Sequence, residues 1–410
     1  MDPREAIAHV LRRAAFGPRP GLVDELGPIG PAGVVELLVD GAADAVDSTA
    51  LLAGSPGRDD DGAAVVSWWL QRLRSPDARL HERMVWYWHG HFTSSVAKVE
   101  AEMMWLQHLA VRRHALGNFR DLTRAMVTDA AMLVYLDGDG SSGEMPNENL
   151  ARELMELFTL GVGSYSEDDV KAGARALSGW WVDWETTEVH FEPHEHYDRP
   201  VTFLGRRARW DAEAVVDAVC DHSACPAHVA RGLYRHLVGV DPAPDRLDAL
   251  ARGFRDTDLE ILPLVAEILR GEDFHAAVRS RPRQPVEWLV AALASLGADD
   301  AEIDPYQLET HGQVPFMPPN VAGWPDDERW LAGSQVLTRV NQVLQLGSEE
   351  LIDADVLPEV DEVLDRCGIY EVSSTTREVL DQAATAQSEY EHRLELLFAL
   401  ALTSPEFALA

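Results

Sequence analysis

Lysine, cysteine and long apolar runs are all scarce in this chain of 410 residues. Lysine occurs only at Lys98 and Lys171, and every other basic residue is an arginine. With 35 basic and 69 acidic residues, the formal net charge is −34. Such a negative surface repels phosphate backbones and anionic lipids, so we expect no nucleic-acid partner and no membrane partner. No segment has the roughly 18–20 consecutive apolar residues of a membrane helix.

Three cysteines, Cys220, Cys225 and Cys367, are too few for a disulfide framework, which fits a reducing compartment. The N-terminal segment lacks the apolar core and the cleavage site of a secretory signal. Both observations predict a cytoplasmic protein. Common catalytic signatures are also missing, since there is no G-x-S-x-G, no HExxH and no phosphate-loop lysine in the glycine-rich segment 138–143.

Apolar residues recur at spacings of three and four along most of the chain, which predicts a mainly helical protein. The segment 180–205 instead has β-branched and aromatic residues near period two, which predicts a small β-hairpin insertion. Four prolines in PFMPPNVAGWPDD (315–327) exclude regular structure there. The last two helices are expected at about 330–346 and 375–402. We expect one large multi-helix domain over 1–410, with possible sub-lobes at 1–55, 62–180, 206–346 and 347–410, the first two separated by a Gly/Asp-rich break at 54–62.

The densest polar stretch is PNENLARELMELFTLG (146–161). On a helix, its apolar residues fall on one side and its polar residues on the other. The polar side predicts groups that converge on one point, as an acid and a base or as ligands of a hard cation. The alternative is a solvated face with an internal Glu148–Arg152 ion pair. The predicted catalytic residues are Glu148, Asn149, Arg152, Glu153 and Glu156.

Histidines supply the predicted metal ligands. In MVWYWHGHFTSS (84–95), His89 and His91 point the same way if the segment is extended, but lie about 200° apart on a helix. In EVHFEPHEHYD (188–198), His196 lies among other histidines and acids. We predict His89, His91 and His196 as ligands of a divalent metal ion. The alternatives are histidines hydrogen-bonded inside a tryptophan-rich core and an exposed acidic hairpin whose histidines have no role.

A third group, CDHSACPAH (220–228), contains two cysteines and two histidines within nine residues. Structural zinc sites usually take two ligand pairs separated by a longer loop. A helix is expected to begin at Pro226, so the ligands would straddle its start. We therefore do not expect a zinc site in this segment.

The chain has twelve tryptophans, and many of them stand beside these polar segments. An aromatic face can stack on a sugar ring, although tryptophans more often fill a core. The predicted substrate-binding residues are Trp88, Trp180, Asn320 and Trp324.

Several motifs occur together in a distinctive order. They are HVLRRAAFGPRP (9–20), WYWHGHF (86–92), AMLVYLDG (131–138), PNENLARELMELFTLGVGSYSEDDVKAGARALSGW (146–180) and PPNVAGWPDDERWLAGSQVLTRVN (318–341). With these motifs the chain resembles, from about residue 9 to its C-terminus, the large bacterial family catalogued as domain of unknown function 1800. The resemblance implies a mainly α-helical fold, frequent export, and a sulfatase-like or phosphatase-like partner encoded nearby. It implies no particular reaction.

Two features depart from the family pattern. Near HYDRPVTFLG, relatives usually have a His-Asp pair and a lysine shortly before Thr-Phe-Leu-Gly. Here His196 is kept, Tyr197 replaces the aspartate and Val201 replaces the lysine. If that pair is catalytic in relatives, this chain has lost it or uses Asp198 instead. The missing export signal is the second departure, so we expect this chain in the cytoplasm or exported with a signal-bearing partner.

Two hypotheses about function follow. The first is an enzyme with a His/carboxylate pocket walled by tryptophans, which carries out metal-assisted hydrolysis of a polar or glycan-like substrate. This hypothesis requires segments 86–92, 146–156 and 194–198 to meet. The second is a non-catalytic scaffold, or a partner- or glycan-binding protein, in which the same residues form a buried network that holds helices together.

Overall fold

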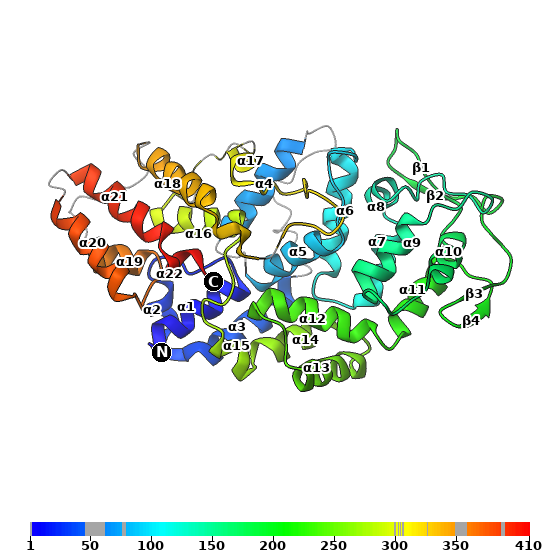
Figure 1. Cartoon of the computed structure of the whole chain (residues 1–410), viewed down its shortest axis with the longest axis horizontal. Coiled ribbons are helices and arrows are strands. Elements are labelled where there is room, and N and C mark those ends of the chain that lie inside the picture. The colour runs from blue at the N-terminus through cyan, green and yellow to red at the C-terminus, as the bar shows by residue number, and fades with distance from the viewer. Residues whose placement is uncertain are drawn as a thin grey trace.

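A computed structural model describes residues 2–45, 62–75, 79–298, 301, 303, 305, 307–325, 327–348, 359–386 and 390–410. Helices make up most of this part of the chain, and the strands form two small antiparallel sheets (Figure 1). The predicted class, a large α-helical body with a small β insertion, is confirmed. The predicted break at 54–62 lies almost wholly outside the described residues.

The N-terminal third is a series of helices whose starts follow ordinary capping chemistry. The Asp2 side chain accepts the Arg4 backbone N–H, and Asn118 and Asp129 cap two later helices in the same way. The elements are α1 (Pro3–Ala14), α2 (Leu22–Leu26), η1 (Gly27–Ile29), α3 (Gly30–Ala45), α4 (Gly62–Arg74), α5 (Leu80–His91), α6 (Ala101–His114), α7 (Phe119–Val127) and α8 (Ala130–Tyr135).

The polar segment 146–161 contains an α-helix that continues as a π-helix. The helix begins as α9 (Asn149–Glu153) and continues as the π-helical turn η3 (Leu154–Thr159). A π turn is wider than an α turn, and such turns occur often at functional sites. Helix α10 (Glu167–Ala176) follows and begins with a capping box between Ser166 and Asp169.

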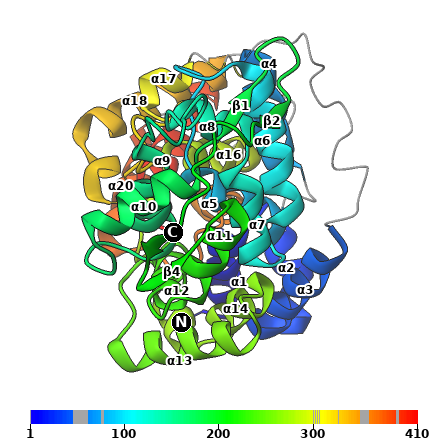
Figure 2. The same ribbon diagram turned by 90° about the vertical axis from the view of Figure 1, so that its right-hand side faces the viewer.

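The β insertion consists of two hairpins rather than one. Strand β1 (Trp180–Val182) pairs with β2 (Val189–Phe191), and β3 (Val201–Phe203) pairs with β4 (Arg206–Ala208). The second hairpin turns at Leu204 and Gly205. Both residues have positive φ, as the two central residues of a type I′ turn require. Both hairpins lie at the end of the molecule opposite α20 and α21 (Figure 1), and this end faces the viewer in Figure 2.

Helices return in the second half and end the chain. They are α11 (Ala212–Asp221), α12 (Cys225–Val238), α13 (Pro244–Asp256), α14 (Ile261–Leu269), α15 (Glu272–Ala276), α16 (Pro285–Leu296), α17 (Gln307–His311), η4 (Glu328–Leu331), α18 (Gly333–Ser348), α19 (Val360–Arg366), α20 (Ser374–Ala386), α21 (Tyr390–Thr403) and α22 (Pro405–Ala408). The single helix predicted at about 375–402 is therefore two helices, α20 and α21.

One cluster of buried hydrophobic residues extends from Ile7 to Phe407. The division into four sub-lobes stays a prediction. Within the described residues, no helix combines the length and the apolar character needed to cross a bilayer.

Candidate functional site

Helix α5 places its two histidines in different surroundings. Because residues 89–91 are helical, the imidazoles point to opposite sides of α5, as the helical alternative predicts. The His89 ring is buried among aromatic rings, and its Nε2 accepts the Phe316 backbone N–H at 3.0 Å. Burial lowers the pKa of His89 to about 3, so this ring is neutral. His89 thus holds the proline-rich loop against α5.

His91, on the other side of α5, contacts the π-helical turn. Its Nε2 lies 3.0 Å from the Phe158 carbonyl oxygen, to which it donates. His228 of α12 does the same to the neighbouring carbonyl, with 2.8 Å between Nε2 and the Leu157 oxygen. The last carbonyls of a helical segment lack helical donors, and here two imidazoles supply the hydrogen bonds. The π turn therefore fixes two histidines from different helices.

These histidines line a pocket of about 410 Å³ between α5, α12 and the proline-rich loop. We call it the imidazole pocket. Its lining residues are Trp86, Tyr87, Gly90, His91, Leu157, His228, Arg231, Gly232, Arg235, His236, Gln284, Ala322 and Trp324. Its volume falls within the roughly 300–1,000 Å³ of small-molecule sites.

Glycines bring the walls of the pocket together. A Cβ added to Gly323 would lie 2.6 Å from the Gly90 carbonyl oxygen, and one added to Gly232 would lie 2.4 Å from the Tyr87 hydroxyl. Only glycine leaves room for the neighbouring backbone at Gly323 and for the tyrosine hydroxyl at Gly232. Gly323 also has a φ of +78°, which side chains other than hydrogen rarely tolerate.

Aromatic side chains form one wall of the pocket. The rings of Trp86 and Trp324 are nearly parallel, with an angle of 10° and 6.1 Å between centroids. The Gln284 Oε1 accepts the Trp86 indole N–H at 3.1 Å and the Gln313 amide N–H at 2.9 Å. Since Gln284 is itself held by Gln313, the orientation of the Trp86 ring is fixed. Trp324 is the one predicted substrate-binding residue that lines this pocket.

Helix α12 gives the pocket its charge. His228, Arg231 and Arg235 recur at spacings of three and four, and His236 lies eight residues after His228, so the four residues share one side of the helix. Burial lowers the pKa of His91 to about 3 and, more than any other cause, lowers the pKa of His228 and of His236. The three imidazoles are therefore neutral, and the two arginines carry the charge. Among the described residues that line the pocket there is no aspartate or glutamate.

The predicted catalytic carboxylates lie elsewhere, in local pairs. Arg152 contacts Glu148 at 3.1 Å and Glu167 at 2.7 Å. Glu156 accepts the Tyr165 hydroxyl at 2.5 Å, and Asn149 donates to Asp137 at 2.7 Å. Burial raises the pKa of Glu153, and Glu156 raises it further. None of the five predicted residues lines the imidazole pocket, so their helix contributes backbone carbonyls to it rather than carboxylates.

The remaining predicted residues are also distributed over the fold. His196 donates from Nδ1 to the Ser178 carbonyl at 3.0 Å, beside the first hairpin. Trp88 is fully buried, and its indole N–H donates to the Ala115 carbonyl. Trp180 packs on Phe191 within the hairpin. Asn320 is exposed and accepts the Ala322 backbone N–H, which closes the turn before Trp324.

The predicted metal ligands His89, His91 and His196 have separate hydrogen-bond partners. Among the described residues, no group of three or more His, Cys, Asp and Glu side chains is placed to hold a metal ion. Cys220 and Cys225 are buried and free, whereas His228 turns to the pocket and His222 accepts the Ala224 backbone N–H. The histidines and cysteines of the segment 220–228 therefore lie in separate surroundings.

The sequence analysis did not single out the arginines of the pocket or His236. Their signal is present in HVARGLYRH (228–236), where polar and small residues recur at helical spacing on an otherwise apolar helix. That spacing predicts the polar face of α12. It does not predict what this face contacts, because the opposite walls of the pocket come from α5 and from a loop about 90 residues further along.

Comparison with known proteins bears on the family. Searches of curated proteins and of solved structures found no match. The sequence does match, over residues 9–409, the family described as "Protein of unknown function (DUF1800)". The match covers nearly the whole chain, including every residue of the imidazole pocket, and the chain belongs to this family.

Proposed function

We propose that the protein is an enzyme that acts on a polar, ring-bearing molecule in the imidazole pocket, with His91 and His228 as proton acceptors. The observation that carries the proposal is that two neutral imidazoles from different helices are held by adjacent carbonyls of one π turn. A carbonyl oxygen only accepts, so Nε2 of each ring must carry the proton and Nδ1 the lone pair.

The open nitrogens suit base catalysis. Nδ1 of His91 and Nδ1 of His228 have no hydrogen-bond partner among the described residues. Both rings line the pocket, and neither Nδ1 is fully buried. The Nδ1 of His228 lies beside Gly161, where an added Cβ would be 2.9 Å from it, so it is the more covered of the two. A neutral imidazole within hydrogen-bond reach of a substrate proton typically accelerates its removal by 10²–10⁴-fold.

The aromatic wall indicates the shape of the substrate. Indole faces stack on sugar and aromatic rings, and the half-buried Trp324 rests on the Trp86 ring, which Gln284 fixes. This supports the expectation of a glycan-like or other ring-bearing substrate. Metal-assisted hydrolysis, a divalent metal cofactor and a separately encoded sulfatase-like or phosphatase-like partner stay predictions. Elemental analysis of protein that was never exposed to a chelator tests the prediction of a bound metal. Co-purification tests the prediction of a partner.

A non-catalytic binding protein is the alternative use of the same pocket. The hydrogen bonds to Phe158 and Leu157 would then serve only to join α5 and α12 to the π turn. The two functions differ in what the open Nδ1 atoms do. A binding protein needs no lone pair on either ring, whereas a base catalyst loses its activity without one.

The test is a panel of chromogenic 4-nitrophenyl esters and glycosides assayed with the wild type, His91→Gln and His228→Gln. Glutamine keeps a donor near the position of Nε2 but has no basic nitrogen. We expect turnover of at least one substrate, reduced about 100-fold or more in either variant at unchanged melting temperature. Turnover that is equal in all three proteins contradicts the assignment of the bases. Stoichiometric ligand binding with no turnover favours the binding protein.

A further inference from the structure

We infer that the molecule bound in the imidazole pocket carries an anionic group, and that Arg231 and Arg235 bind it. This inference rests on the proposed function, because it names the substrate class of the same pocket.

Arg231 and Arg235 are exposed on α12 and lack partners. Neither has a hydrogen bond, ion pair or ring contact in the part of the chain that the structure describes. They are four residues apart on one helix face, where two like charges destabilise a helix by a few tenths of a kcal/mol. Exposed arginines without a described partner also occur at Arg199 and Arg207. Arg231 and Arg235 differ from these because they are neighbours on one helix face and line a pocket. A bound anion would relieve their repulsion.

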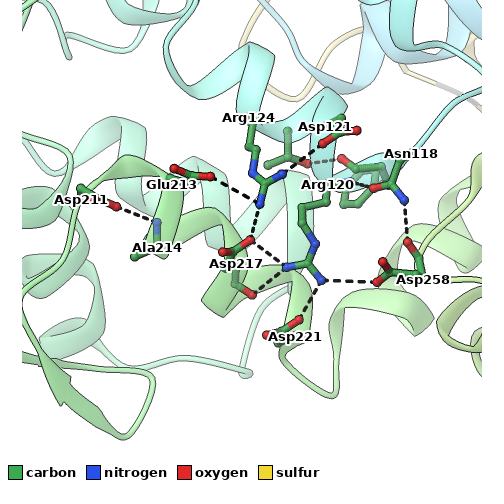
Figure 3. Close-up of polar contacts among 12 residues, drawn as sticks. Asn118, Arg120, Asp121, Arg124, Asp211, Glu213, Ala214, Asp217, Asp221 and Asp258 are labelled. Atoms are coloured by element: carbon green, nitrogen blue, oxygen red, sulfur yellow. Dashed lines mark hydrogen bonds and ion pairs between the residues drawn. The ribbon is translucent and has the colours of Figure 1, made fainter.

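Other arginines show how this protein usually pairs the residue. On α7, Arg120 contacts Asp217 at 3.0 Å and Asp221 at 2.7 Å, and Arg124 contacts Asp217 at 2.7 Å (Figure 3). These acids come from α11, so each guanidinium is neutralised by the neighbouring helix. Arg231 and Arg235 face a pocket instead, and none of the described residues that line it is an acid.

Buried cations lie behind the pocket. His236 lines the pocket, is almost fully buried, and has an Nε2 without a hydrogen-bond partner among the described residues. Arg281, Arg83 and Arg13 act on it as cations, and Glu287, which Arg281 and Arg83 both contact, acts on it as an anion. Arg281 and Arg83 each act on His236 more strongly than Glu287 does, so the local field is positive, and a low-dielectric wall concentrates such a field on the pocket.

The guanidinium group also limits the kind of anion. Its planar fork of donors matches a carboxylate, phosphate or sulfate group in a bidentate contact. The pocket volume of about 410 Å³ exceeds the size of one such group, and the half-buried Trp324, which is backed by the buried Trp86 ring, offers an aromatic surface for the rest of the ligand. The substrate class is therefore a ring-bearing acid, such as a sugar acid or an aromatic acid, or a phosphate or sulfate ester of a ring alcohol.

Two probes that differ only in charge test the inference. We would titrate the full-length protein with 4-fluorobenzoate and with 4-fluorobenzamide, follow both by ¹⁹F NMR, and add 4-fluorophenyl phosphate to separate a carboxylate from a phosphate ester. The test variant is Arg231→Gln/Arg235→Gln. The matched control is Arg199→Gln/Arg207→Gln, which removes two other exposed arginines without described partners from the region of the second hairpin.

We expect an anionic probe to bind about tenfold or more tightly than the amide, an advantage that falls with salt. The test variant should abolish this advantage, and the control should keep it. Equal binding of acid and amide, unchanged in the test variant, overturns the anionic assignment but leaves a ring-binding pocket intact. Loss of the advantage in the control as well overturns it too, because net charge rather than the pocket is then responsible. If no probe binds, the anionic assignment is wrong. The proposed role of His91 and His228 as bases is tested separately, by turnover in the chromogenic panel.

Discussion

His91 has a structural and a chemical task at the scale of a single residue, and two substitutions separate them. His91→Leu leaves the buried Phe158 carbonyl without its donor, which costs about 1–3 kcal/mol of unfolding free energy. His91→Gln keeps a donor and should cost less than 1 kcal/mol. Urea unfolding at pH 7.5 measures both. If glutamine destabilises as much as leucine, the hydrogen bond to the π turn is not what holds the ring.

Gly323 tests how the pocket is closed. In Gly323→Ala the new Cβ would meet the Gly90 carbonyl oxygen at 2.6 Å in a backbone with positive φ, so strain and a backbone collision add. The matched control is Gly163→Ala, which also has a positive φ, +88°, but meets no atom within 4 Å. We expect the control to lose about 1 kcal/mol of stability and Gly323→Ala to lose roughly 1–3 kcal/mol more. Equal losses would mean that the loop yields freely.

At the scale of elements, a buried ion-pair cluster attaches α16 to α5 behind the pocket. Glu287 accepts from Arg83 of α5 and, at 2.7 Å, from Arg281, and it also accepts the Gln284 backbone N–H at the start of α16. The two arginines hold the pKa of Glu287 well below its usual range, against the effect of burial. Removing one partner of such a cluster leaves buried charge without compensation.

We therefore expect Glu287→Gln to reduce the free energy of unfolding by roughly 3–5 kcal/mol. Glu213→Gln is the control, because exposed Glu213 lies 4.0 Å from Arg124 at the edge of the network in Figure 3 and should lose under about 1 kcal/mol. Chemical denaturation of both variants measures the difference. A loss under 1 kcal/mol in Glu287→Gln would show that the cluster contributes little to folding.

The same scale shows what a sequence can predict here. Helices, the β insertion and the capping box at Ser166 follow from local spacing, because 3.6-residue periodicity and side-chain caps are encoded within one turn. Continuation of α9 as a π turn, and the role of its carbonyls at Leu157 and Phe158, depend on His91 and His228 from remote helices. The carboxylates of 148–156 were predicted as catalytic because reactive side chains can be recognised in a sequence. The hydrogen-bonding role of a particular backbone carbonyl cannot be recognised in this way.

At the scale of the whole molecule, the interior and the exterior carry opposite charge. Among the described residues, eight arginines but four glutamates are buried. The arginines are Arg12, Arg13, Arg74, Arg83, Arg112, Arg281, Arg283 and Arg339, and the glutamates are Glu5, Glu82, Glu287 and Glu406. The exterior is thus more acidic than the net charge of −34 alone indicates. In such an exterior, a positive pocket attracts a diffusing anion only at short range, within the Debye length of roughly 8–10 Å.

Buried histidines make the stability of the whole fold depend on pH. Burial lowers the pKa of His9, His89 and His91 to about 3, from 6.5 in the unfolded chain. Below pH 6.5 the unfolded state therefore binds protons that the folded state does not, so stability is complete above pH 6.5 and is lost as the pH falls toward 3. Each such histidine contributes about 1.4 kcal/mol per pH unit within that window.

We expect urea midpoints to be constant from pH 8 to 7 and to fall steeply below pH 6, before most carboxylates titrate. His9→Gln is the test variant, because glutamine can keep the donor that His9 Nε2 offers to the Phe274 carbonyl, 2.8 Å away, but does not titrate. Its stability should fall by about 1.4 kcal/mol less per pH unit than that of the wild type between pH 6 and 4. His190→Gln, on the exposed edge of the first hairpin, should follow the wild type. Parallel curves for all three proteins would mean that His9 is protonated in the folded state, and that its burial does not exclude the charge.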